Sequence, residues 1–350
     1  MTLGPIIISI SGEELTSNDR EILGNDLIGG VILFTHNFRN KSQLLSLTKA
    51  IKAIKSPELM IFVDQEGGRI QRFKDGFFHL PSFRDLGAIY DFCPEKGIRS
   101  AHLSGYIMAS ELIEQGIDLS FSPVVDIDYD LSKVISDRSF HADPEVVYKM
   151  ADSYIRGMNN AGMHAVAKHF PGHGGVKADS HHHQPIDNRD YEQIKKDLKP
   201  YIKLIEDKLM GIMTAHILYP KVDQEITTFS KKWLIGILRE KYSYQGYVFS
   251  DDLTMQSAAE IGTIEDRVYT ALDAGCNFLL WCHPDETVLD VLKNLSDIKL
   301  DLSGSYKVIK PKSSAINHER FQKSITETVS YTHLRAHETD SYLVCRLLLE

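Results

Sequence analysis

Eight short apolar runs, rich in β-branched residues and each followed by a longer segment with helical periodicity, constrain the fold of this 350-residue chain. They span residues 5–10, 30–34, 59–63, 119–125, 164–167, 211–215, 246–249 and 276–281. Strands that are buried on both faces have continuous apolar sequences, and helices between them require parallel pairing. The pattern predicts an α/β fold, a single-domain (β/α)8 barrel of the TIM type. A doubly wound sheet is the alternative, but it usually has fewer strands and a glycine-rich phosphate loop, which this sequence lacks.

Polar residues follow six of these runs directly, where the strands are expected to end. They are Asp64, Glu66, Arg69, Asp126, Asp128, Lys168, His169, His216, Asp251, Asp252 and His283. Barrel enzymes hold their catalytic groups at the carboxyl ends of the strands. Strand ends are also simply exposed, but polar residues after six of eight runs favour an active site.

The segment 168–185, KHFPGHGGVKADSHHHQP, concentrates titratable groups on a glycine-rich loop after the fifth run. Side chains two residues apart in an extended segment point the same way. The Asp179 carboxylate is therefore placed to orient the His181 imidazole, and the pair is a candidate general acid/base dyad. A solvated histidine-rich loop is the alternative interpretation, and it is preferred for His182 and His183.

The charge and hydropathy of the chain exclude several classes of partner. There are 48 acidic and 39 basic residues, for a formal net charge of −9. Because the basic residues form no dense block, nucleic acid is not expected as a main partner. No apolar stretch reaches the roughly 18 residues of a membrane span, and the first residues do not resemble a signal peptide. A cytoplasmic enzyme with no membrane partner is expected.

The last part of the chain, residues 329–350, differs from the sequence before it. From residue 330 it is SYTHLRAHETDSYLVCRLLLE, which resembles the in-frame translation of sequencing-adapter DNA. We therefore expect residues 1–328 to form the barrel and residues 329–350 to be a non-native, poorly packed tail.

Four motifs, in this order along the chain, resemble glycoside hydrolase family 3 and, within it, the bacterial β-N-acetylhexosaminidases. They are DQEGGRIQR (64–72), DRSF (137–140), the loop 168–185 and SDDLTM (250–255). The resemblance extends from near the N-terminus to about residue 294. It implies the same barrel fold and a retaining glycosidase without a cofactor.

The resemblance also implies roles for individual residues. Asp251 would be the nucleophile that forms a covalent glycosyl-enzyme, with Asp252 in support, and His181 with Asp179 would be the acid/base pair. Two adjacent carboxylates repel each other, whereas an imidazolium beside the nucleophile is attracted to it. The sugar-binding positions of the family match Asp64, Arg72, Arg138, Lys168 and His169.

The resemblance also implies a small-molecule substrate, a muropeptide that carries N-acetylglucosamine (GlcNAc) and is processed in peptidoglycan recycling. A monomer is expected, and the sequence does not choose between water and phosphate as the acceptor. Two alternatives remain open. One is a metal-dependent barrel hydrolase that uses His169, His173, Asp179, His181 and the strand-end carboxylates, although no metal is expected in the preferred interpretation. The other is a non-catalytic sugar-binding protein.

Overall fold

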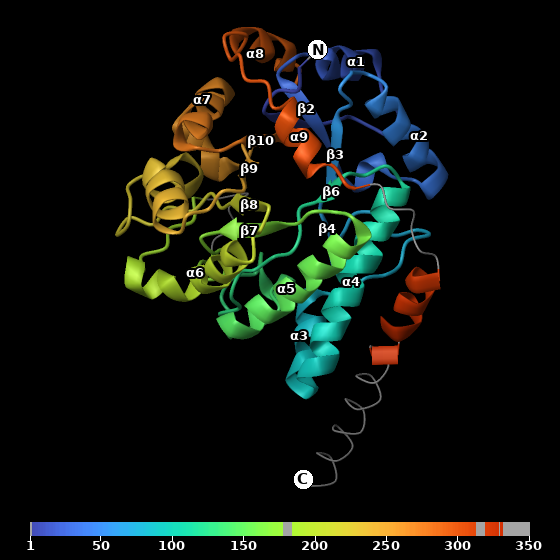
Figure 1. Ribbon diagram of the computed structural model, residues 1–350. Coiled ribbons are helices and arrows are strands. Elements are labelled where there is room, and N and C mark those ends of the chain that lie inside the picture. Colours follow the sequence, from blue (N-terminus) through green and yellow to red (C-terminus); the bar gives the residue numbers. More distant parts are fainter. Residues whose placement is uncertain (1, 178–183, 313–318, 329, 332–350) are drawn as a thin grey trace.

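The computed structural model describes residues 2–177, 184–312, 319–328 and 330–331 (Figure 1). Eight parallel strands form its main sheet, and each overlaps one of the eight apolar runs. They are β1 (Ile6–Ser9), β2 (Ile28–Leu33), β3 (Met60–Val63), β6 (Leu119–Ser120), β7 (Val166–Phe170), β8 (Gly211–Thr214), β9 (Tyr247–Asp252) and β10 (Phe278–Trp281). The strands are almost entirely buried, as continuous apolar runs predict.

The sheet closes on itself. Its strand order is β6-β3-β2-β1-β10-β9-β8-β7, with parallel pairing throughout. The segment that follows β6 meets β7, the other end strand, through a parallel bridge between Val124 and Lys168. The Val166 amide also donates to the Ser122 carbonyl at 3.0 Å. Because residues 122–124 link β6 to β7 and so complete the ring of strands, the predicted (β/α)8 barrel in a single domain is confirmed.

Helices surround the barrel and connect its strands (Figure 1). They are α1 (Ser17–Gly24), α2 (Lys41–Lys52), α3 (Phe83–Phe92), α4 (Pro94–Glu114), α5 (Pro144–Ala161), α6 (Tyr191–Glu206), the π-helix η4 (Lys232–Lys241), α7 (Ile264–Ala274), α8 (Val288–Asn294) and α9 (Ser303–Ile309). Capping boxes at Thr16, Ser82, Asp190 and Thr263 begin α1, α3, α6 and α7. None of the helices in the described part of the chain is long and apolar enough to cross a membrane.

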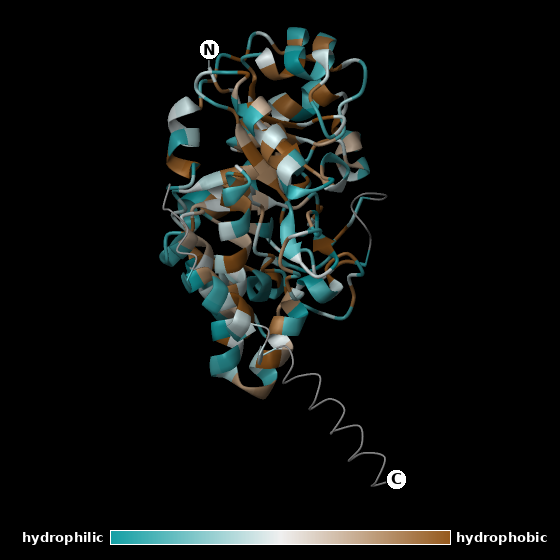
Figure 2. Ribbon diagram, turned by 90° about the vertical axis from the view of Figure 1, so that its right-hand side faces the viewer, coloured by the Kyte–Doolittle hydropathy of each residue, from teal (hydrophilic) through white to brown (hydrophobic). Residues whose placement is uncertain are grey.

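Aromatic rings fill the barrel. Phe62 of β3 lies 5.3 Å from Phe121 and 6.3 Å from Phe249 of β9, measured between ring centroids. Phe249 in turn stacks on Phe278 of β10 at 4.8 Å. Because β3 and β9 are not neighbours in the sheet, these contacts cross the interior. The strands are mostly hydrophobic in Figure 2, whereas the helices alternate hydrophobic and hydrophilic residues. The interior is thus a packed core, which fixes the strand ends rigidly.

Two glycines let α4 and α5 approach closely. A Cβ at Gly105 would lie 2.2 Å from the Tyr154 carbonyl oxygen, and one at Gly157 would lie 2.0 Å from the His102 carbonyl oxygen. Real Cβ atoms do not come this close, so larger residues would force the helices apart. These helices precede β6 and β7, and their packing holds in place the two strands that close the barrel.

One element was not predicted from the sequence. A short antiparallel hairpin, β4 (Gln65–Gly67) and β5 (Ile70–Gln71), follows β3 at the carboxyl end of the barrel. Gln65 holds it together, because its amide oxygen accepts from the Arg72 and Phe73 amides at 2.8 and 3.1 Å. The hairpin therefore places Glu66 and Arg72 beside the strand ends. Apart from residues 330 and 331, the predicted tail 329–350 lies outside the described residues.

Candidate active site

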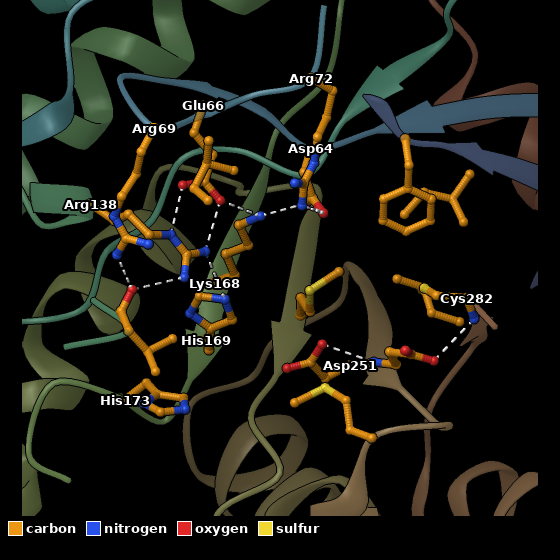
Figure 3. Close-up of a pocket in the computed structure, with 18 of the residues that line it drawn as sticks. Asp64, Glu66, Arg69, Arg72, Arg138, Lys168, His169, His173, Asp251 and Cys282 are labelled. Atoms are coloured by element: carbon orange, nitrogen blue, oxygen red, sulfur yellow. Dashed lines mark hydrogen bonds and ion pairs between the residues drawn. The ribbon is translucent and has the colours of Figure 1, made fainter. Parts of the chain in front are cut away.

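A cavity of about 490 Å³ opens at the carboxyl ends of the strands (Figure 3). This volume is in the range of small-molecule sites. Six of the eight residues predicted for the site line it: Asp64, Arg72, Arg138, Lys168, His169 and Asp251. The other two, Asp179 and His181, lie outside the described residues. The barrel thus brings together side chains that are far apart in the sequence.

A buried ion network forms one wall of the cavity (Figure 3). Lys168 Nζ lies 2.7 Å from both Asp64 Oδ1 and Glu66 Oε1. Arg138 binds both oxygens of Glu66, with distances of 2.8 and 2.9 Å. Arg72 Nη2 lies 3.6 Å from Asp64 Oδ2. Bidentate guanidinium–carboxylate pairs fix geometry as well as charge, so this wall is preorganised for a polar ligand.

The network keeps its carboxylates ionised. Burial alone would raise the pKa of Glu66, but the positive charges of Arg138 and Lys168 outweigh burial and hold that pKa well below its usual range. The pKa of Asp64 is also lowered, because Lys168 and then Arg72 offset the cost of burial. Three cations therefore face two anions, and the wall retains positive charge for ligand oxygens.

Asp251 and Asp252 end β9 in different roles. Asp252 Oδ1 accepts from the Cys282 and Thr254 amides, both at 3.0 Å, and Oδ2 accepts from Thr254 Oγ1 at 2.7 Å. Its carboxylate is thus used in holding the turn. The Asp251 side chain lines the cavity, and its Oδ1 accepts from the Asp252 amide at 2.8 Å. In Figure 3 it lies on the other side of the cavity from Glu66.

His216, at the end of β8, supports the same turn. Its Nε2 lies 2.9 Å from the Asp252 carbonyl oxygen, and its Nδ1 lies 2.8 Å from Thr228 Oγ1. Since a carbonyl only accepts, Nε2 carries the proton and the Thr228 hydroxyl donates to Nδ1. Burial lowers the pKa of His216, which keeps it neutral in this arrangement. His216 therefore fixes the backbone next to Asp251.

Three basic residues surround the mouth of the cavity. Lys133 and Lys177 are exposed, and neither forms a salt bridge with another described residue. Arg69 is also exposed, and its Nε lies 2.6 Å from Asp137 Oδ1. In a chain with a net charge of −9, this basic mouth produces a local field that attracts anions.

Two buried carboxylates were not assigned to the site from the sequence. Glu66 organises the ion network, and Asp126, which is 2 % exposed, binds His169. The sequence showed them only as polar residues that follow predicted strands, which did not indicate a role for either. Their roles depend on contacts to Arg138 and His169, which are 72 and 43 residues away along the chain.

The described residues contain no group of three or more His, Cys, Asp or Glu side chains that could hold a metal ion. This observation does not extend to residues 178–183, which include Asp179 and His181.

The barrel, with charged and imidazole side chains around a cavity at its strand ends, defines an enzyme of the (β/α)8 class that acts on a small polar substrate. Residues 7–304 match the family model described as the glycosyl hydrolase family 3 N terminal domain. The chain belongs to this family, and it is a glycosidase.

Several relatives are similar over most of their length. A beta-hexosaminidase of Nitrosomonas eutropha is 47 % identical over 296 residues, which cover 84 % of this chain and 85 % of that protein. A beta-hexosaminidase of Methylobacillus flagellatus is 46 % identical over the same share of each chain. The structure of NagZ from Neisseria gonorrhoeae in complex with N-trifluoroacetyl-D-glucosamine is 37 % identical, with a TM-score of 0.85 and coverage of 95 % of this chain and 99 % of that one.

Proposed function

We propose that this glycosidase is a retaining β-N-acetylglucosaminidase that releases GlcNAc from muropeptides in the cytoplasm, as a step of peptidoglycan recycling. The observation that carries the proposal is the arrangement of one cavity. The Asp251 carboxylate lines the same pocket as the Lys168–Asp64–Arg72 cluster, on the opposite side from the Glu66–Arg138 pair. The hexosaminidase names of the relatives, and the glucosamine derivative bound to one of them, support the choice of sugar.

The ion network is suited to hold a pyranose. Asp64 offers carboxylate oxygens to sugar hydroxyls, while Arg72 and Lys168 offer N–H donors beside it. Several such bonds to vicinal hydroxyls fix the ring relative to a reacting group, and much of the rate advantage of enzymes comes from this positioning. In the proposed complex they hold the anomeric carbon near Asp251.

In the first chemical step, an Asp251 carboxylate oxygen attacks the anomeric carbon and forms an ester bond. The glycosidic C–O bond breaks, and its electron pair goes to the leaving oxygen, which takes a proton from His181. In the second step His181 removes a proton from water, whose oxygen attacks the anomeric carbon and releases Asp251. Asp179 orients His181 throughout. Two inversions at the same carbon retain the β configuration.

The basic mouth supports an acidic leaving group. Muropeptides carry carboxylates on their peptide portion, and the exposed side chains of Arg69, Lys133 and Lys177 line the same cavity. Opposite charges raise association rates and favour such ligands over neutral ones. A neutral chitin oligosaccharide would not be attracted by these positive charges.

The test is hydrolysis of p-nitrophenyl N-acetyl-β-D-glucosaminide by the full chain, compared with the matching β-glucoside, each with and without EDTA. We expect turnover of the N-acetyl substrate alone, unaffected by EDTA. With phosphate present, the product should be GlcNAc, since GlcNAc 1-phosphate would identify a phosphorylase. Loss of turnover in EDTA would support the metal-dependent hydrolase. A folded protein that binds GlcNAc without turnover would be a sugar-binding protein.

A further inference from the structure

Asp126 is a buried carboxylate that the proposed mechanism does not use. It follows β6, and its side chain is fully inaccessible to solvent. Its Oδ1 accepts from the backbone amides of His169 and His173, at 3.3 and 2.7 Å. Its Oδ2 lies 2.7 Å from His169 Nδ1. A carboxylate with this many aligned donors is fixed in orientation, and so is the imidazole bound to it.

The neighbours of His169 determine which ring nitrogen carries the proton. On the cavity side, Arg138 Nη2 lies 3.4 Å from His169 Nε2. A guanidinium can only donate, so Nε2 must accept there. On the buried side, the Asp126 carboxylate accepts from Nδ1. Both partners select the same form of the ring, with the proton on Nδ1 and a lone pair on Nε2.

We propose that Asp126 is a positioning residue that fixes this tautomer of His169, so that the Nε2 lone pair faces the cavity. A sugar hydroxyl then donates to Nε2 in place of the long 3.4 Å contact from Arg138. The identity of the ligand as a GlcNAc glycoside rests on the proposed function, whereas the tautomer does not. In any histidine oriented by a buried carboxylate, the group bound to one ring nitrogen determines whether the other nitrogen donates or accepts a hydrogen bond.

Asp126→Asn separates this role from general support of the structure. The asparagine oxygen is expected to stay with the two backbone amides, which both require an acceptor. Its NH₂ group then faces His169 Nδ1 and requires a lone pair there, so the ring proton moves to Nε2. The cavity then meets an Nε2–H donor where the wild type offers a lone pair, and this N–H also faces the N–H groups of Arg138. The side-chain volume and the backbone contacts are retained.

The experiment uses the full chain with ¹⁵N-labelled histidine. A long-range ¹H–¹⁵N spectrum reports which nitrogen of each neutral ring is protonated, and the spectrum of His169→Gln identifies the His169 signals. We expect the proton on Nδ1 in the wild type and on Nε2 in Asp126→Asn. The affinity for GlcNAc and kcat/KM should fall on the order of 10- to 100-fold, as for a lost buried hydrogen bond. Asp128→Asn is the control, since its side chain lies in the same loop and accepts from the Asp130 amide at 2.9 Å. It should leave the His169 tautomer, the affinity and kcat/KM unchanged.

A double-mutant cycle shows whether Asp126 acts through His169. If it does, Asp126→Asn should weaken GlcNAc binding little or not at all when His169 is already alanine. An equal loss in both backgrounds would overturn the proposal, as would a wild-type His169 protonated on Nε2. The wild-type spectrum alone shows which nitrogen of His169 is protonated, even if Asp126→Asn does not fold. Absence of hydrolysis by the wild type would refute the proposed function and leave the tautomer result intact.

Discussion

Replacing Glu66 with glutamine removes one charge from the buried ion network and keeps the side-chain volume. Glu66 is 2 % exposed and holds Arg138 at 2.8 and 2.9 Å and Lys168 at 2.7 Å. In Glu66→Gln, an NH₂ group faces one of these cations. Removing one partner of a buried ion pair costs about 3–5 kcal/mol. In a domain of this size 1 kcal/mol lowers Tm by roughly 2 °C, so we expect a loss on the order of 6–10 °C.

The effect should depend on pH in a defined direction. Burial opposes ionisation of Glu66, but Arg138 and Lys168 lower its pKa in the folded state. A carboxyl with a lowered folded pKa contributes stability that is complete above its unfolded pKa of about 4.3. The contribution is lost as the pH falls toward the folded value. The difference in Tm between the wild type and Glu66→Gln should be constant from about pH 6 to 8 and should narrow below about pH 4.

Thermal unfolding followed by calorimetry across this pH range measures both effects. The control is Glu192→Gln, which neutralises a side chain that is 75 % exposed and paired with Lys195 at 2.7 Å. Exposed pairs contribute at most about 1 kcal/mol, so this variant should melt within about 2 °C of the wild type. If Glu66→Gln melts as high as the control, or if its deficit stays constant into acid, the assigned role of the network is wrong.

Four other changes have defined outcomes. Asp251→Ala should lower kcat more than roughly thousand-fold while GlcNAc still binds by calorimetry, and a loss under tenfold would exclude it as nucleophile. His181→Ala should slow aryl glycosides with poor leaving groups more than activated ones, so equal losses in kcat/KM would argue against a general acid. Gly157→Ala places a Cβ 2.0 Å from a carbonyl of the facing helix and should cost about 1–3 kcal/mol. Its control, Gly236→Ala, meets nothing within 4 Å and should stabilise the protein by about 0.5–1 kcal/mol in chemical denaturation. A chain that ends at Thr328 should keep the Tm and kcat/KM of the full chain, and a lower Tm would show that the tail is part of the fold.

The fold could be predicted from the sequence because its signals are local. A strand that is buried on both faces needs a continuous apolar run, and each of the eight runs overlaps a strand. The β4–β5 hairpin gave no such signal, because segments of two and three residues are too short to show a period. Its geometry depends instead on hydrogen bonds that the Arg72 and Phe73 amides donate to Gln65 Oε1.

The set of residues at the site was also largely determined by sequence, because the carboxyl ends of all barrel strands meet at one end. The sequence therefore placed Asp64, Lys168 and Asp251 together before any distance was known. It did not assign roles to Glu66 and Asp126. A buried carboxylate is defined by its partners, and here those partners come from other strands and loops. Only the closed barrel brings them within hydrogen-bond distance, where the direction of each bond decides which group binds the ligand and which one holds it in place.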